Sequence, residues 1–439
     1  MQMRTTRAMI MGAALAFGTL GTAPAAALAY AQETQAEAPS EATKFEARAA
    51  DVVAMIKGER PVEEVISPEF LASVPAEQFA QIGQQLTAQF GPVIGVEEVQ
   101  PVEPDRAMIT LRFEKATVGG PMNLEATAPF LVNGLLLNDI KPVAGDANSV
   151  SADMESLSGS KAAWFGPLDG DPVFAYGDPA KPFAIGSTFK LYVLAALARA
   201  VDEGRLAWDD VVALDAKSFP SGVMQTWPDG APVTLQTAAT LMISISDNTA
   251  TDLVMRTLGR EAIEAEMRAS GHGDMGKTLP FLTTREMFVL KASDLGEDYA
   301  MADEAERRAM LATLDLGSIE EDRVLQTFTS GTPVLIEDIE WFASVADQRS
   351  LMRVLAALPG DTARNIMAVN PVFDEEETAN WDYVGYKGGS EAGVLNMSWL
   401  LRDHAGRWYM LAISQMDPAS EVDTASLLLM AKRILALAE

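Results

Sequence analysis

The sequence contains no cysteine and only two histidines, His272 and His404, among its 439 residues. The missing cysteine excludes disulfide bonds, a thiol nucleophile and thiolate metal sites. Two histidines are too few for a histidine-rich metal cage, so we expect no metal and no other cofactor. We also expect any hydrolytic chemistry to proceed without histidine.

Positive charge is scarce as well. The chain has 33 basic and 62 acidic residues, which gives a formal net charge of −29. Such an acidic chain is not drawn to nucleic acid or to an anionic membrane surface. Apolar types make up 48% and charged types 22% of the residues, which is typical of globular proteins and excludes a wholly disordered chain. The length predicts two or three domains.

The N-terminus has the pattern of an export signal. Arg4 and Arg7 precede an apolar run from Ala8 to Ala29, and Ala29-Tyr30-Ala31 fits a signal-peptidase cleavage site. We therefore predict a signal peptide over 1–31 and a periplasmic or secreted protein. A membrane anchor fits less well, because the run is rich in Ala and Gly and ends in a cleavage site. No later stretch is apolar for long enough to span a bilayer, so no membrane insertion is expected after cleavage.

The next part of the chain predicts a flexible leader over 32–43 and a small α+β domain over 44–145. Helical spacing over 45–56 and 76–90 is followed by strand-like runs, with a turn predicted at Gly119-Gly120-Pro121. Helices followed by an antiparallel sheet favour an α+β unit, whose element order resembles the ketosteroid-isomerase-like or cystatin-like fold. It holds no convergent acid/base set, which favours a packing or docking role.

A segment rich in Ser, Gly and Asp predicts a linker over 146–160, so a chain beginning near Ser160 should fold alone. The remainder, 161–439, is predicted to form a second α+β domain. Strand patterns lie near both of its ends, including a hairpin at Asp169-Gly170, and helical patterns lie between them. This order predicts one sheet built from distant segments with a helical part beside it. The predicted helices cover 189–201, 234–243, 248–258 and 425–438, and the C-terminal strands cover 394–401 and 408–415.

Ser187 and Lys190 lie where a loop ends and an apolar, buried helix begins. Residues three apart share a helix face, so we expect the two side chains to touch. A serine hydroxyl needs a neighbouring base to become a good nucleophile, and a desolvated lysine with a lowered pKa can be that base. The same spacing at Ser158 and Lys161 falls in the predicted linker, so the spacing alone is a weak signal.

Two further motifs follow in the chain. Ser246-Asp247-Asn248 lies between two predicted helices, where each residue type is also a common helix cap. Lys387-Gly388-Gly389-Ser390 lies in the strand-rich C-terminal part, where it is also compatible with a strand-edge lysine before a turn.

Together and in this order, the three motifs resemble the active-site set of class A β-lactamases and penicillin-binding proteins. The resemblance covers most of 161–439 and implies a β-lactamase/transpeptidase-like α/β sandwich. It implies that Ser187 is the acylated nucleophile, Lys190 the base and Ser246 a proton relay. It also implies that the substrate is held by Asn248, Lys387, Gly389 and Ser390. The backbone N–H groups of Ser187 and Ser390 would form the oxyanion hole.

The sequence departs from this family in three places. The residue after the third-motif lysine is usually Thr or Ser but is Gly388 here, and Ser390 is the candidate replacement. The loop glutamate that activates the deacylating water is not evident. Two carboxylates are candidates for this role. Glu286 has capping-box spacing with Thr283, which also explains it as a helix cap, and Asp274 is the other loop carboxylate. Glu261, Glu264 and Glu266 are predicted to be solvated, and the acidic segment 303–377 resembles an insertion.

Three functions are compatible with these residues. The first is an exported serine hydrolase that opens β-lactams through an acyl-serine intermediate. The second is an esterase or penicillin-binding-protein-like enzyme that turns β-lactams over slowly, which the missing glutamate favours. The third, a non-catalytic binding protein, does not need a nucleophile–base pair. A Ser-His-Asp hydrolase is disfavoured because Gly-x-Ser-x-Gly is absent. The expected partner is a small β-lactam or ester substrate, and the sequence does not show whether there is a protein partner.

Overall fold

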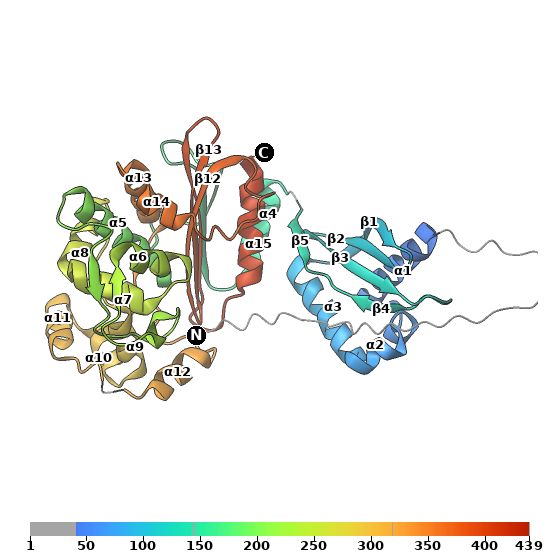
Figure 1. The fold of residues 1–439 in the computed structure, drawn as a ribbon, viewed down its shortest axis with the longest axis horizontal. Coiled ribbons are helices and arrows are strands. Elements are labelled where there is room, and N and C mark those ends of the chain that lie inside the picture. The colour runs from blue at the N-terminus through green and yellow to red at the C-terminus, as the bar shows by residue number, and fades with distance from the viewer. Residues whose placement is uncertain (1–40, 144, 318, 439) are drawn as a thin grey trace, which may run out of the picture. The chain divides into compact units, whose positions relative to one another are not determined.

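The structure is a computed structural model that describes residues 41–143, 145–317 and 319–438. The described residues form two compact units, 41–143 and 145–438 (Figure 1). The predicted signal peptide lies outside the described residues, as does most of the predicted leader. Residues 41–43, which the sequence assigned to the leader, lie in the first turn of α1. No helix of the described residues is both long and apolar enough to cross a membrane.

The smaller unit has its helices first and an antiparallel sheet after them, as its sequence predicted. The strand order is β1-β2-β3-β4, and β5 also pairs with β3. The elements are α1 (Glu41–Ile56), η1 (Val62–Glu64), α2 (Pro68–Ser73), α3 (Ala76–Phe90), β1 (Val93–Glu103), β2 (Arg106–Phe113), β3 (Ala116–Leu124), β4 (Val132–Leu135) and β5 (Asp139–Pro142).

The turn predicted at Gly119-Gly120-Pro121 is wrong, because these residues lie inside β3. β3 pairs with β2 along one edge and with β5 and β4 along the other. Gly120 has φ +151°, and a Cβ there would lie 2.0 Å from the carbonyl oxygen of Leu136. The glycine therefore permits a close approach of two chain segments within the sheet rather than a reversal of the chain.

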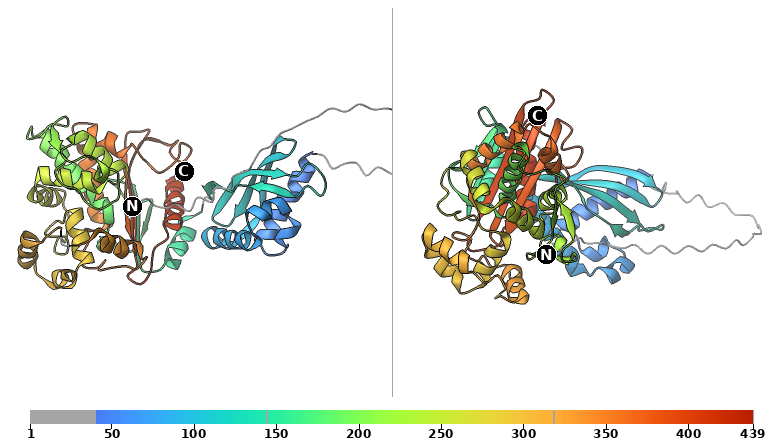
Figure 2. Two further views of the ribbon diagram at one scale, coloured as in Figure 1. Left: turned by 60° about the horizontal axis from the view of Figure 1, so that its bottom comes forward. Right: turned by 60° about the vertical axis from the view of Figure 1, so that its left-hand side comes forward.

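The larger unit is built on one five-stranded antiparallel sheet of order β12-β13-β14-β6-β7. Residues 160–176 supply two of its strands and residues 381–416 supply three, which confirms a sheet made from distant segments. Helices α4 and α15 cover one face, and the helices from α5 to α14 lie on the other (Figures 1 and 2). The hairpin at Asp169-Gly170 is present between β6 and β7.

The strands of this unit are β6 (Ser160–Pro167), β7 (Phe174–Tyr176), β8 (Phe183–Ala184), β9 (Val211–Ala213), β10 (Pro232–Thr234), β11 (Phe342–Ala343), β12 (Trp381–Glu391), β13 (Val394–Asp403) and β14 (Trp408–Met416). The helices are α4 (Ala147–Ser156), η2 (Gly186–Phe189), α5 (Lys190–Asp202), η3 (Met224–Thr226), α6 (Leu235–Ser244), α7 (Asn248–Leu258), α8 (Arg260–Ala269), α9 (Thr284–Ala292), α10 (Leu295–Met301), α11 (Glu304–Thr313), α12 (Glu321–Thr329), α13 (Val345–Ala357), α14 (Thr362–Met367), α15 (Thr424–Leu435) and η4 (Ala436–Ala438).

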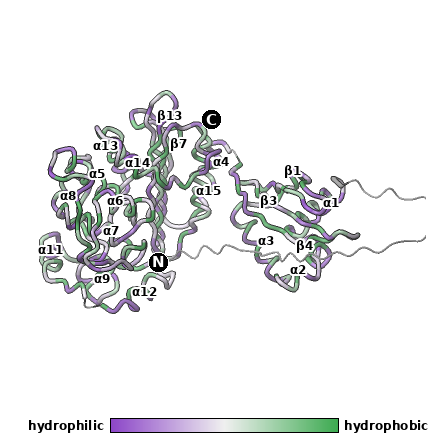
Figure 3. Tube along the Cα trace, viewed as in Figure 1, coloured by the Kyte–Doolittle hydropathy of each residue, from purple (hydrophilic) through white to green (hydrophobic). Residues whose placement is uncertain are grey.

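Helix α5 is the centre of the helical layer. Apolar residues occur along the elements of both units (Figure 3), but α5 is buried on every side from Lys190 to Ala198. A helix that is apolar all round belongs in a core, and the buried helix predicted from the sequence is confirmed. The single lysine in this stretch is therefore placed where water does not reach it.

The linker predicted over 146–160 is wrong, because most of it forms α4. Asp146 caps this helix by accepting the backbone N–H of Ser149 at 2.8 Å. Val150 and Met154, four residues apart, are buried in the apolar cluster beneath α15. The polar residues that suggested a flexible linker form the N-terminal cap of α4 and the side of α4 that faces solvent.

Candidate active site

The first motif is held at the start of the buried helix by a single turn of 3₁₀-helix. Gly186 begins η2 with φ +47°, and the backbone N–H of Lys190 donates to the carbonyl oxygen of Ser187. In a 3₁₀-helix, side chains three residues apart lie directly above one another. Ser187 and Lys190 therefore share one face, with Ser187 partly exposed and Lys190 fully buried.

The third motif reaches this turn because two glycines let the backbones meet. A Cβ at Gly389 would lie 2.3 Å from the backbone nitrogen of Ser187. A Cβ at Gly186 would lie 2.9 Å from the backbone nitrogen of Ser390. Since β12 is an edge strand of the sheet, it has backbone groups that no neighbouring strand pairs. The backbone N–H groups of Ser187 and Ser390, which are expected to form the oxyanion hole, thus lie beside the contact between Gly186 and Gly389.

Lys190 is connected to the second motif by three hydrogen bonds. Its Nζ lies 2.8 Å from the carbonyl oxygen and 3.0 Å from Oγ of Ser246, and 2.7 Å from Oδ1 of Asn248. The predicted contact with Ser187 is not among the side-chain hydrogen bonds of the described residues. Burial, and to a lesser extent the charge of Lys387, hold the pKa of Lys190 well below its usual range. A lysine with a lowered pKa gives up its proton more readily, and its deprotonated form has a lone pair with which to accept one.

The second motif is fixed by a strained residue and a helix cap. Ser246 adopts φ +58°, which is uncommon for a residue other than glycine. Asp247 caps α7 by accepting the N–H of Ala250 at 2.8 Å, and its other oxygen accepts the N–H groups of Val223 and Met224. The cap that the sequence suggested is therefore present, and it also positions the Ser246 side chain toward Lys190.

The predicted substrate ligand Asn248 is engaged at both ends of its side chain. Its Oδ1 accepts from Lys190, and its Nδ2 donates to the carbonyl oxygen of Phe219 at 3.1 Å. The side chain is 5% exposed. Asn248 therefore holds the base in place, and its contact with substrate stays a prediction.

Lys387 brings a second ammonium group to the same hydroxyl. Its Nζ lies 3.1 Å from Oγ of Ser246, so this oxygen lies between two lysines. Burial lowers the pKa of Lys387 to about 7. At neutral pH the group is therefore half charged, and its charge changes within the physiological range.

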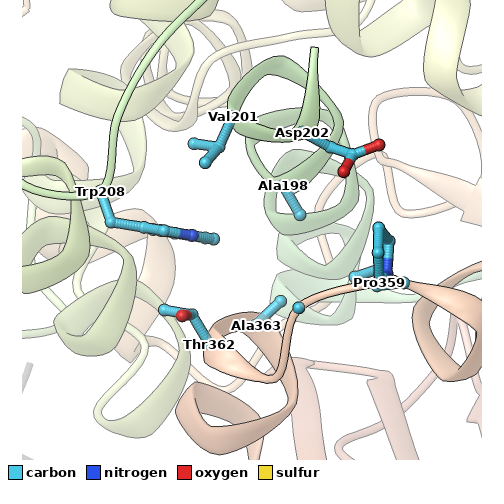
Figure 4. A pocket seen from close by; sticks show the side chains of 9 residues that line it. Ala198, Val201, Asp202, Trp208, Pro359, Thr362 and Ala363 are labelled. Carbon is cyan, nitrogen blue, oxygen red and sulfur yellow. The ribbon is translucent and has the colours of Figure 1, made fainter. Parts of the chain in front are cut away.

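These residues surround one cleft of about 780 Å³. Lys190 is not among the residues that line the cleft. The other six of the seven predicted site residues line it: Ser187, Ser246, Asn248, Lys387, Gly389 and Ser390. A separate cavity of about 90 Å³ between α5 and α14 contains none of them (Figure 4). Neither histidine lines the cleft, which removes the Ser-His-Asp alternative. Within the described ranges no cluster of acidic or histidine side chains is suited to hold a metal ion.

Residues 148–314 match the family model described as the Beta-lactamase enzyme family. This part of the larger unit is therefore β-lactamase-related in sequence. The matched stretch contains the Ser187–Lys190 and Ser246–Asn248 motifs and ends before Lys387. The assignment rests on this sequence match, and a search of curated proteins found no significant match to the chain.

Solved structures of the same kind resemble the chain over about two thirds of its length. The β-lactamase from Sphaerobacter thermophilus DSM 20745 is 21% identical with a TM-score of 0.46, covering 66% of this chain and 95% of that one. The β-lactamase from Desulfarculus baarsii DSM 2075 is 18% identical with a TM-score of 0.46, covering 67% and 98%. A structure of PBP-A is 17% identical with a TM-score of 0.46, covering 66% and 94%.

A tyrosine fills the space beside Gly388, the position at which the resemblance implies a Thr or Ser. A Cβ at Gly388 would lie 2.1 Å from the hydroxyl oxygen of Tyr386. The phenol therefore occupies the space that a Thr or Ser side chain at position 388 would use. Tyr386, Gly388 and Ser390 alternate along β12 and line the cleft together. The sequence analysis missed Tyr386, although its two-residue spacing from Gly388 was a usable signal.

Neither carboxylate considered for deacylation lines the cleft. Glu286 forms the predicted capping box with Thr283, and its Oε1 accepts from Arg260 at 2.6 Å. Asp274 is exposed and accepts the N–H of Gly276. Glu264 and Glu266 are not solvated as predicted. Each is 3% exposed or less, because Arg308 and Arg199 pair with them.

The acidic segment 303–377 supplies part of the cleft wall. It forms α11, α12, β11, α13 and α14, and β11 pairs with β8 just before Ser187. Apolar side chains of α12 line the cleft beside others from α9 and the loop before η3: Phe219, Met287, Phe288, Val324, Leu325 and Phe328. Sequence reasoning did not find this apolar wall, because no local pattern shows which helix will lie beside the nucleophile.

Proposed function

We propose that the chain is a serine acyl-hydrolase of the class A β-lactamase type that acts through an acyl-Ser187 intermediate. The observation that carries this proposal is Lys190, a fully buried lysine with a lowered pKa on the same helix face as Ser187. A binding protein has no need of a buried lysine with a lowered pKa beside a partly exposed serine. Burial of a lysine costs stability, which a catalytic role explains.

The acylation step follows from the positions of these groups. Lys190, in the deprotonated form that its lowered pKa favours, accepts the proton of Ser187 as the serine Oγ attacks the substrate carbonyl. Ser246, in contact with both lysines, passes a proton to the leaving group. The N–H groups of Ser187 and Ser390 stabilise the negative charge on the carbonyl oxygen. The hydrogen bonds of Ser246 with both lysines support its role as a relay, and Asn248 positions Lys190.

The lining of the cleft supports a substrate with an anionic end and an apolar acyl group. Lys387 offers a positive charge, and the Tyr386 hydroxyl offers a hydrogen-bond donor. The α12 wall offers apolar surface. A β-lactam with an aromatic acyl side chain carries both features. A small ester carries only the acyl part, so we expect esters to react with less discrimination.

A slower enzyme of the penicillin-binding-protein type is the second candidate. It is favoured by the fact that Glu286 and Asp274 lie outside the cleft lining. Without a base for water, acylation would be followed by a long-lived adduct. In either case we propose that the chain is exported to the periplasm or beyond, on the strength of the signal pattern over 1–31.

Intact-mass spectrometry after mixing with a penicillin tests the proposal. The expected result is a mass increase by one penicillin per chain that disappears with time. Ser187→Ala should abolish the adduct. Ser244→Ala is the matched control, because Ser244 also lines the cleft but its Oγ donates to Thr240 within α6. An adduct of normal yield on Ser187→Ala would place the nucleophile elsewhere.

A further inference from the structure

Three charged side chains at the wall of the cleft have no part in acylation. Lys291 of α9 lies between Glu340 and Glu391, at 3.1 Å from Oε1 of Glu340 and in a shorter contact with Oε1 of Glu391. The side chains of Lys291 and Glu340 are 0% and 1% exposed, and that of Glu391 is 11% exposed. Both glutamates line the cleft. Glu391 is therefore the member of the group that water reaches most readily.

The backbone brings both carboxyl groups toward the nucleophile. Glu391 lies two residues beyond Gly389 on the face of β12 that also carries Lys387, and Gly389 touches the backbone of Ser187. Glu340 precedes Trp341, whose carbonyl oxygen accepts the N–H of Ile185 at 2.9 Å. The two carboxyl groups thus come from segments that contact the chain between Ile185 and Ser187.

Three groups set the protonation of this site. Burial and the neighbouring Glu340 raise the pKa of Glu391 well above its usual range, and the charge of Lys291 opposes them. A carboxylate with a raised pKa is a stronger base than a solvated one. Lys291 is itself held charged, because contacts with both glutamates raise its pKa despite burial. The ammonium therefore fixes the carboxyl groups in place.

We propose that Glu391, positioned by Lys291 and Glu340, is the general base that activates water for hydrolysis of the acyl-Ser187 intermediate. The proposal rests on the proposed function, which supplies that intermediate. The water oxygen forms a bond to the acyl carbonyl carbon while one of its protons passes to Glu391. The bond from this carbon to Oγ of Ser187 breaks, and the proton passes on to Oγ. The hydroxyl and the carboxylate are restored, and the acid product leaves.

The other acidic side chain in the cleft lining is less suited to this role. Glu421 is exposed and lies in the loop before α15. A side chain on an exposed loop is held less firmly than one on a strand, whereas a general base must stay within hydrogen-bond reach of its water. Glu421 is therefore the matched control for Glu391, since it has the same side chain and lines the same cleft.

The test is the lifetime of the penicillin adduct, followed by intact mass on the full chain. Glu391→Gln should form the adduct at nearly the wild-type rate and lose it roughly 10²- to 10⁴-fold more slowly, the usual cost of losing a general base. Glu421→Gln should keep the wild-type lifetime. Glu340→Gln should slow the loss less, because Lys291 and Glu391 remain paired.

The results with the variants and with the wild-type chain test the role of Glu391 and the proposed function separately. A wild-type adduct lifetime in Glu391→Gln would overturn the role of Glu391 and leave the proposed function standing. If the wild-type chain neither forms an adduct nor hydrolyses a penicillin or nitrophenyl acetate, the proposed function fails. Thermal unfolding reports whether Glu391→Gln folds. If it does not fold, Glu391→Asp replaces it, because this variant keeps the charge beside Lys291 but moves the carboxylate. Slower loss of the adduct in Glu391→Asp supports the proposal, and a wild-type adduct lifetime overturns it.

Discussion

A single titrating lysine gives the cleft a pH dependence. Burial lowers the pKa of Lys387 to about 7, so the group is charged below this pH and neutral above it. Only the charged form attracts a substrate carboxylate. The KM for a penicillin should therefore rise with pH, on the order of fivefold between pH 7 and pH 8 if only the charged form binds. Steady-state kinetics across pH 6 to 9 measure this rise.

A neutral ester separates this effect from titration of the base. The KM for nitrophenyl acetate should not change across pH 7, because the ester has no carboxylate for Lys387 to hold. Lys387→Met should remove the pH dependence of the KM for penicillin and leave it high throughout. An equal rise for both substrates would mean that the titrating group acts on the fold or on Ser187 rather than on substrate charge.

The apolar wall formed by α12 sets a preference for the acyl group. Phe328 packs edge-to-face against Phe288 with ring centroids 4.5 Å apart, and both rings line the cleft. Phe328→Ala removes apolar surface worth about 1.5–3 kcal/mol when buried. We expect kcat/KM for a nitrophenyl ester of an eight-carbon acid to fall roughly tenfold. The rate with the acetate ester should stay nearly constant, since a two-carbon acyl group has little apolar surface to bury against the wall.

The test depends on the ratio of the rate with the eight-carbon ester to the rate with the acetate ester. A fold defect in Phe328→Ala would lower both rates together and leave their ratio unchanged. An unchanged ratio in a fully folded variant, as judged by thermal unfolding, would show that the acyl chain lies elsewhere in the cleft.

Local signals made some elements predictable from the sequence. The limits predicted for α7, Asn248 and Leu258, match the structure because Asp247 caps the helix from its own sequence neighbourhood. A turn was predicted inside β3, and α4 was missed. Pairing with β2 and β5 decides the first segment, and docking on α15 decides the second. Polar composition alone does not distinguish a linker from a capped helix with one apolar side.

The residues of the candidate site also fall into those that the sequence predicts and those that only the fold reveals. Ser187, Ser246 and Lys387 were found because each belongs to a short motif. Glu340 and Glu391 were not found, because 51 positions of chain separate them and only the fold around Lys291 brings them together. The lowered pKa of Lys190 was anticipated from its place in an apolar helix, but its partners Ser246 and Asn248 depend on how α7 packs beside α5.

At the scale of the whole molecule, the position of α4 decides where the larger unit begins. Val150 and Met154 are fully buried beneath α15, and Arg433 of α15 pairs with Asp153. Burial of two such side chains is worth roughly 3–6 kcal/mol. This is a large fraction of the 5–15 kcal/mol that holds a typical domain together. A chain that begins at Ser160 lacks these contacts, so the sequence-based expectation that it folds alone needs revision.

Two shortened chains test this boundary. A chain that starts at Gly145 keeps α4, and we expect its unfolding temperature to equal that of the larger unit in the full chain. A chain that starts at Ser160 should unfold at a temperature lower by on the order of 10 °C, or aggregate, because it exposes the apolar side of α15. Differential scanning calorimetry of both, beside the full chain, measures the difference. Equal unfolding temperatures would mean that α4 adds no net stability, and that the domain begins where its sheet begins rather than where its apolar cluster does.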